Sequence, residues 1–226
     1  MSETVVKICG LTTPDDALDA ARAGADLLGM VFVDGSKRQV DIDRAKEVVS
    51  FVRGWYEQKN ARRAQTPQCG PTDQLSCPKF VGVFADQGAA LMNQAAQRAG
   101  LDLIQLHGDE PASLITDLTR PVIRALRVKR SLPDTSSWRG AQWILFDAAT
   151  GGSGETFDWN VLSRFKGSFL LAGGLTPENV ATAITATGAT GVDVASGVES
   201  SPGVKDREKV QAFITAARAE SFTDNR

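Results

Sequence analysis

Short apolar segments recur along the chain and alternate with segments of helical spacing. The apolar segments are rich in Val, Leu, Ile and Phe and are bounded by Gly, Pro or Asp, as is typical of short strands. Most are apolar throughout, which indicates parallel strands buried on both faces. We predict strands at Val5–Ile8, Leu27–Val31, Phe80–Phe84, Leu103–Gln105, Val122–Leu126, Trp143–Phe146, Phe169–Ala172 and Val192–Val194.

Segments with Ala, Val, Leu and Ile at helical spacing lie between several of these strands. Pro14 and Pro177 each follow a threonine, which is the order expected where a helix begins. Eight βα units in 226 residues predict an α/β fold, a (β/α)₈ TIM barrel forming a single domain over residues 1–226. An open doubly wound sheet is the alternative. The predicted helices are Pro14–Ala23, Asp41–Val52, Ala89–Ala99, Pro177–Ala186 and Asp206–Ala219.

One polar segment, residues 54–78, separates the second predicted helix from the third predicted strand. It contains three prolines and few branched aliphatic residues. We expect a disordered or loosely packed surface insertion. A loop that leads from a helix to a strand lies at the end of a barrel opposite the active site, so we expect no catalytic role for it. Its cysteines, Cys69 and Cys77, are expected to be exposed bystanders.

Composition narrows the possible partners. The formal net charge is −2, which favours neither nucleic acid nor an anionic membrane. No apolar run is long enough to span a bilayer, and the N-terminal residues lack the pattern of a secretory signal. With three widely spaced cysteines and one histidine, we expect no metal and no cofactor. The chain reads as a reduced, cytoplasmic protein.

Four residues able to carry chemistry follow predicted strands, where the active site of such a barrel lies. Each also has a purely structural reading. Cys9 could be a buried structural cysteine or a reactive thiol. Asp147 could be an ion-paired side chain or an acid, and Arg38 could be solvated or hold a carboxylate. His107 is the one histidine of the chain and by itself is a weak signal.

Glycine-rich segments follow the seventh and eighth predicted strands. Gly173 and Gly174 come after the seventh strand, and Ser196 and Gly197 come after the eighth. Glycine lets the backbone approach a phosphate closely, and consecutive N–H groups supply donors. Tight turns alone would also use glycine. Two such loops at adjacent strand ends favour a small phosphorylated substrate, because these loops form the usual phosphate site of such barrels.

Motifs spread over nearly the whole chain make it resemble the phosphoribosylanthranilate isomerase family. Single motifs are weak, but their order is specific, and only residues 54–78 fall outside them. One departure is Ala195-Ser196, where the family often has Ser or Gly first, and small residues serve equally there. The motifs are KICGLTTPDDA, GADLLGMVFVDGSKRQV, VGVF, IQLHGDE, FDAATGGSGETFDW, LLAGGLTPENV and GVDVASGVESSPGVKD.

The resemblance implies an isomerase of tryptophan biosynthesis that carries out an Amadori rearrangement of N-(5′-phosphoribosyl)anthranilate. The implied product is 1-(2-carboxyphenylamino)-1-deoxyribulose 5-phosphate. Asp147 matches the general acid that opens the ribose ring, which would need a raised pKa. Cys9 matches the base, acting as a thiolate, that removes the C2 hydrogen. Arg38 matches the residue that holds the anthranilate carboxylate.

The remaining implied contacts are spread around the substrate. Backbone N–H groups of Gly173, Gly174, Ser196 and Gly197 would hold the phosphate. We expect Asp193 to bond a ribose hydroxyl and His107 to line the pocket wall. For Lys7, two roles stay open: it supports the thiolate or fills a polar core.

Three alternatives stay open. A related phosphate-binding barrel enzyme is disfavoured by Cys9 on the first strand and Arg127 at the end of the fifth. A non-catalytic barrel that binds a phosphorylated metabolite is disfavoured by the presence of both Cys9 and Asp147. We expect a free-standing monomer, while a relationship to a multifunctional tryptophan-pathway polypeptide is compatible with activity.

Overall fold

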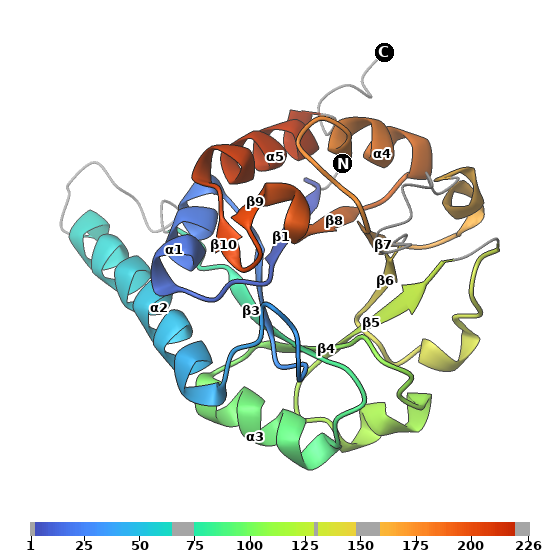
Figure 1. Ribbon diagram of the computed structural model, residues 1–226, viewed down its shortest axis with the longest axis horizontal. Helices are drawn as coiled ribbons and strands as arrows, with labels where there is room; N and C mark the ends of the chain where they lie inside the picture. Colours follow the sequence, from blue (N-terminus) through green and yellow to red (C-terminus); the bar gives the residue numbers. More distant parts are fainter. Residues whose placement is uncertain (1–2, 65–74, 129–130, 148–158, 220–226) are drawn as a thin grey trace.

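Eight parallel strands form a closed barrel in chain order, with β8 pairing back onto β1. The computed structural model describes residues 3–64, 75–128, 131–147 and 159–219. Figure 1 looks onto the barrel, with the helices placed around its outside. The predicted TIM barrel is confirmed, and every predicted strand is present. The strands are β1 (Val5–Cys9), β2 (Leu27–Val31), β3 (Lys79–Phe84), β4 (Leu103–Leu106), β5 (Val122–Arg127), β6 (Trp143–Asp147), β7 (Phe169–Ala172) and β8 (Gly191–Val194).

Five α-helices are present in the described part of the chain, in the five predicted places. The described parts of the connections after β4, β5 and β6, where no helix was predicted, contain 3₁₀ helices. None of the described helices is both long and apolar enough to cross a membrane. The helices are α1 (Pro14–Ala23), α2 (Ile42–Ala64), α3 (Ala89–Ala99), α4 (Val180–Thr187), α5 (Arg207–Ala219), η2 (Ala112–Asp117), η3 (Ser136–Trp138), η4 (Trp159–Arg164) and η5 (Ser196–Val198).

Local chemistry explains where α1 and α4 begin. The Thr13 side chain accepts a hydrogen bond from Asp16 N and caps α1, as the sequence predicted. Thr176 does not cap in the same way. The Asn179 side chain accepts from the Thr176 N–H at 2.8 Å and closes a turn, so α4 begins at Val180, three residues later than predicted.

The prediction of a disordered or loosely packed segment at residues 54–78 is wrong for residues 54–64, which continue α2 as a regular helix. Tyr56 is buried, and its hydroxyl donates to Ala21 O at 3.1 Å. Asn60 exchanges two hydrogen bonds with the backbone of Leu75. These contacts fix the helix although its apolar pattern is weak. Cys77 is exposed as expected, and Cys69 lies outside the described residues.

Side chains of successive residues in each strand point to opposite sides, which divides the core into an outer and an inner part. Every second side chain points outward and packs against the helices. The others point into the barrel, where an apolar layer closes its centre. Polar residues Lys7, Gln105 and Asp193 have the same inward parity and lie nearer the carboxyl ends of their strands. The inner apolar layer consists of Leu27, Val81, Leu103, Ile123, Ala125, Leu145, Leu170 and Ala172.

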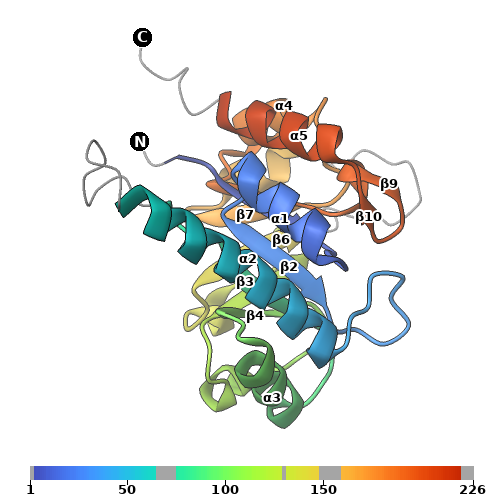
Figure 2. The same cartoon turned by 90° about the vertical axis from the view of Figure 1, so that its left-hand side faces the viewer.

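A short hairpin follows β8 and lies at the same end of the barrel. It consists of β9 (Glu199–Ser201) and β10 (Val204–Lys205), which pair antiparallel. Figure 2 shows this hairpin and the loop after β2 at one end of the molecule, and the last turns of α2 at the other. The helical part of the insertion therefore lies away from the carboxyl ends of the strands.

Candidate active site

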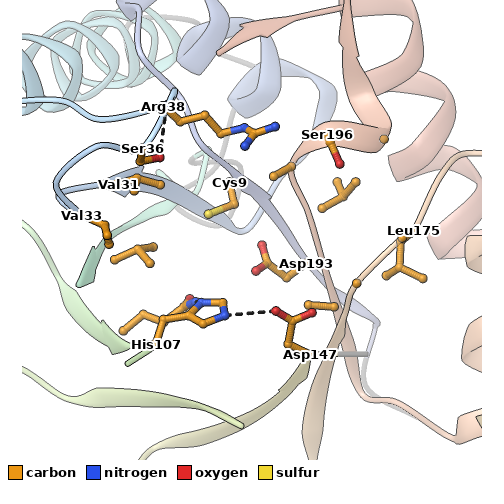
Figure 3. A pocket seen from close by; sticks show the side chains of 18 of the residues that line it. Cys9, Val31, Val33, Ser36, Arg38, His107, Asp147, Leu175, Asp193 and Ser196 are labelled. Carbon is orange, nitrogen blue, oxygen red and sulfur yellow. Dashed lines mark hydrogen bonds and ion pairs between the residues drawn. The ribbon is translucent and has the colours of Figure 1, made fainter. Parts of the chain in front are cut away.

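A cavity of about 460 Å³ opens at the carboxyl ends of the barrel strands. All nine residues that the sequence nominated for the site line it, although they come from segments far apart in the chain. Figure 3 views this cavity and shows Cys9, Asp147 and Asp193 around the same space, with Arg38 and Ser196 above them. The nine are Cys9, Arg38, His107, Asp147, Gly173, Gly174, Asp193, Ser196 and Gly197.

Cys9 is the last residue of β1 and is buried at the floor of the cavity. Burial raises the pKa of its thiol, and the nearby ammonium of Lys7 opposes that rise only in part. The thiol form therefore prevails in neutral solution. The family resemblance implies a thiolate at Cys9, and burial disfavours that charged form. Lys7 is the neighbour whose charge favours it.

Lys7 lies two residues before Cys9, on the same inward face of β1. Its side chain is fully buried, and its ammonium donates to Asp193 Oδ1 at 2.9 Å. The pairing of β1 with β8 places Lys7 directly beside Asp193. Burial works against the ammonium charge, but Asp193 and Cys9 outweigh it and raise the pKa of Lys7. Lys7 thus holds a positive charge against both the thiol and a carboxylate.

The carboxylate of Asp147, at the end of β6, faces the imidazole of His107. His107 Nε2 lies 3.1 Å from Asp147 Oδ2, and the amide nitrogen of Gln105 lies 3.1 Å from His107 Nδ1. Because an amide N–H donates, Nδ1 accepts in this arrangement and Nε2 carries the proton toward Asp147. His107 therefore orients the Asp147 carboxylate as well as lining the wall. Gln105 was not singled out from the sequence, although its inward parity in β4 pointed to it.

Arg38 reaches the cavity from the loop after β2 and is held by a residue that the sequence did not single out. Its Nε and Nη2 donate to the two carboxylate oxygens of Glu199 at 2.7 and 2.6 Å. Lys205 donates to the same carboxylate at 2.8 Å. Glu199 lies within the motif GVDVASGVESSPGVKD, but nothing in that motif indicates that Arg38 is its partner.

The loops after β7 and β8 lie against one another. Gly173 and Gly174 both have positive φ, which turns their backbone at the end of β7. Gly197 in η5 approaches the carbonyl oxygen of Leu175 so closely that a Cβ there would collide with it. The two glycine-rich loops thus share one edge of the cavity, where Gly173, Gly174 and Gly197 contribute backbone alone.

The opposite wall of the cavity is apolar. It was not identified from the sequence, although the alternation within the second and third strands could have indicated it. Such a wall fits a flat hydrocarbon group better than a charged one. Among the described residues, no group of three or more His, Cys, Asp or Glu side chains could hold a metal ion. The apolar wall consists of Val31, Val33, Val83 and Ala85.

A parallel eight-stranded barrel with a thiol, a carboxylate and two glycine-rich loops at its carboxyl end belongs to the TIM-barrel class that does chemistry at that end. The family model described as N-(5′-phosphoribosyl)anthranilate (PRA) isomerase matches residues 6–216. The chain therefore belongs to the N-(5′-phosphoribosyl)anthranilate isomerase family.

Individual relatives agree with this family. The chain is 42% identical over 226 residues to N-(5′-phosphoribosyl)anthranilate isomerase of Geotalea uraniireducens, covering 95% of this chain and 98% of that one. It is 37% identical over 252 residues to tryptophan biosynthesis protein TRP1 of Phytophthora nicotianae, covering 95% of this chain but 47% of that protein.

Solved structures show the same likeness. Phosphoribosyl anthranilate isomerase from Thermus thermophilus is 32% identical, with a TM-score of 0.76 and coverage of 95% and 98%. A phosphoribosyl anthranilate isomerase solved in complex with reduced 1-(o-carboxyphenylamino)-1-deoxyribulose 5-phosphate is 31% identical, with a TM-score of 0.73 and coverage of 96% and 99%.

Proposed function

We propose that this site converts N-(5′-phosphoribosyl)anthranilate to 1-(2-carboxyphenylamino)-1-deoxyribulose 5-phosphate, with Asp147 as acid and Cys9 as base. The observation that carries the proposal is that Cys9 and Asp147 border one cavity that has Arg38 on one side and two glycine-rich loops on another. The reaction is a step of tryptophan biosynthesis, and the family to which the chain belongs is named for this substrate.

The first step opens the ribose ring. Asp147 gives a proton to the ring oxygen, the bond between C1 and that oxygen breaks, and the nitrogen lone pair forms an iminium double bond to C1. The ring oxygen becomes the C4 hydroxyl. His107 holds Asp147 Oδ2 at 3.1 Å, which fixes the direction in which the carboxyl group points. General acid catalysis of this kind contributes about 10²–10⁴-fold.

The second step moves a proton from C2. The iminium makes the C2 hydrogen acidic, and the sulfur of Cys9 removes it. The electron pair of that C–H bond forms the C1–C2 double bond and neutralises the nitrogen. The resulting enolamine gains a proton at C1 and loses one from its C2 hydroxyl, giving the aminoketose. Lys7 favours the thiolate that this step needs, because its charge opposes the effect of burial on Cys9.

The two anionic ends of the substrate fit the two polar sides of the cavity. Gly173, Gly174, Ser196 and Gly197 would bind the phosphate through their backbone N–H groups. Arg38 would hold the anthranilate carboxylate, with the aromatic ring against the apolar wall. Asp193, one of whose oxygens accepts from Lys7, would bond a ribose hydroxyl with the other.

The biological setting follows from the same features. A reducing compartment keeps a catalytic thiol from forming a disulfide, so we place the reaction in the cytoplasm. We propose a monomer, because the large apolar side chains that are exposed in the described residues, Phe51, Leu91 and Val204, lie on three separate elements. The longer relative TRP1, of which this chain covers 47%, supports a relationship to multifunctional tryptophan-pathway polypeptides.

Loss of fluorescence from freshly made phosphoribosylanthranilate on addition of the protein tests the proposal. A barrel that only binds a phosphorylated metabolite would show no turnover. We expect Cys9→Ala to lower kcat at least about 100-fold, with little change in KM, because the base acts only after binding. Cys77→Ala, which changes an exposed thiol, is the matched control. Near-normal turnover by the Cys9 variant would show that Cys9 is not the base.

A further inference from the structure

Three charged side chains form a cluster beside the cavity. The proposed reaction gives a role to Arg38 but none to its two partners, Glu199 and Lys205. Arg38 and Lys205 both donate to the carboxylate of Glu199, at distances between 2.6 and 2.8 Å. The Glu199 and Lys205 side chains are 5% and 2% exposed, whereas that of Arg38 is 25% exposed. Arg38 is therefore the member of the cluster that faces the cavity.

Glu199 uses only one edge of the Arg38 guanidinium. A guanidinium has a side edge, formed by Nε and one terminal nitrogen, and an end edge, formed by the two terminal nitrogens. Glu199 occupies the side edge, because it accepts from Nε and Nη2. Within the described part of the chain, no hydrogen bond is seen for Nη1. The end edge can thus bind a second carboxylate in the bidentate manner.

Lys205 explains how a carboxylate is tolerated next to a site for anions. Burial alone would raise the pKa of Glu199, but the hydrogen bonds from Arg38 and Lys205 outweigh burial and lower it. The carboxylate is therefore ionised. Burial lowers the pKa of Lys205, and the carboxylate of Glu199 opposes that effect. Because Lys205 shares the negative charge of Glu199 with Arg38, part of the charge of Arg38 stays available to a ligand.

Hydrogen bonds to backbone carbonyl groups in and beside the hairpin hold this cluster in place. Lys205 also donates to Ala195 O at 3.1 Å, next to the glycine-rich loop after β8. The Lys209 ammonium donates to Glu199 O at 3.1 Å, and Thr12 Oγ1 donates to Gly203 O at 2.7 Å. On its other side, the Arg38 side chain passes so close to Gly10 that a Cβ there would collide with it. The path of Arg38 is thus restricted from both sides.

From this geometry we propose that Glu199, which accepts hydrogen bonds from both Arg38 and Lys205, is a positioning residue that turns the end edge of Arg38 toward the ring carboxylate of the substrate. This inference rests on the proposed role of Arg38 in the isomerase reaction. A role that is only structural, joining the loop after β2 to the hairpin, would weaken all ligands alike. The proposal instead requires a loss that is specific for the carboxylate.

The test compares two ligands that differ only in that carboxylate, using calorimetry. One is reduced 1-(o-carboxyphenylamino)-1-deoxyribulose 5-phosphate, and the other is the same compound made from aniline. We expect Glu199→Gln to weaken the carboxylated ligand about tenfold, as for loss of one charge-assisted hydrogen bond, and to leave the aniline compound unchanged. KM should rise by a similar factor while kcat changes little. Glu199→Asp, which keeps the charge, should fall between Glu199→Gln and the parent protein.

Arg38→Met separates failure of this inference from failure of the proposed function. If Arg38→Met removes the preference for the carboxylated ligand and Glu199→Gln does not, the positioning role is wrong and the carboxylate subsite stands. If Arg38→Met keeps the preference, the carboxylate binds elsewhere and both ideas fall. In the Arg38→Met background, Glu199→Gln should have no further effect on the preference. Glu47→Gln, which breaks the exposed pair with Arg44 on α2, should bind both ligands normally.

Discussion

Buried charge beside a thiol is the feature at the residue scale that most affects the chemistry. Burial raises the pKa of Cys9, while Lys7 opposes that rise from the same inward face of β1. Asp193 in turn holds Lys7 in its charged form. A base that is generated in this way has a stronger affinity for protons than an exposed thiolate, and this favours removal of a hydrogen from carbon.

The pH dependence of kcat/KM should reveal this arrangement. The base acts deprotonated and the acid Asp147 acts protonated, so kcat/KM should pass through a maximum as pH rises, and one limb of the profile reports Cys9. Lys7→Met removes the charge that opposes the effect of burial on Cys9. The limb that reports Cys9 should then move to higher pH.

The rate at which Cys9 is alkylated, followed by mass spectrometry over the same pH range, should shift to higher pH in the same way in Lys7→Met. This measurement does not depend on turnover. Lys79→Met, which removes an exposed lysine at the start of β3, is the control. An unchanged profile in Lys7→Met would mean that Lys7 only fills a polar core.

At the scale of elements, the loops after β7 and β8 depend on each other. Gly197 contacts the backbone of Leu175, and this contact sets the spacing of the two glycine-rich loops. A side chain at position 197 would push them apart and separate N–H groups that must converge on one phosphate.

We therefore expect Gly197→Ala to raise KM at least about tenfold, equivalent to about 1.4 kcal/mol, and to weaken inhibition by inorganic phosphate by a similar factor. The measurement is steady-state kinetics with and without inorganic phosphate. Gly54→Ala makes the same substitution in α2, where a Cβ would meet nothing within 4 Å. That control should keep its KM and gain up to about 1 kcal/mol of stability. If Gly197→Ala binds phosphate normally, the two loops do not act as one subsite.

Across the whole molecule, contacts that stabilise the barrel and groups that carry the chemistry lie at different ends. The last turns of α2 are far from the hairpin and the loop after β2 (Figure 2). There Tyr56 joins α2 to α1 through its bond to Ala21 O. In barrels of this class, the end opposite the active site contributes stability.

Tyr56→Phe should lower the free energy of unfolding by about 1 kcal/mol, because one buried hydrogen bond is lost while the ring is kept. The kcat/KM should be unchanged. Urea denaturation and the fluorescence assay measure the two quantities on one preparation. A fall in kcat/KM without a fall in stability would show that the two ends of the barrel communicate.

Local pattern in the sequence was sufficient to predict the places of the eight strands and the five α-helices, and the residues that follow the strands. Parallel strands that are buried on both faces have a clear apolar signature, and inward parity within each strand is fixed by the two-residue repeat. Closure of the barrel then brings every strand end to one place. For this reason Cys9, Asp147 and the glycine-rich loops could be nominated together before any contact was known.

Pairing between distant side chains was decided only by the tertiary structure. Arg38 and Glu199 are separated by 161 residues, and Lys7 and Asp193 by 186. Local sequence pattern cannot predict such a pair, because its two members meet only when β8 pairs with β1 and the hairpin folds over the loop after β2. The end of α2 was missed for a similar reason. Residues 54–64 have little apolar periodicity, and the contacts of Tyr56 and Asn60 with distant backbone groups hold them in a helix.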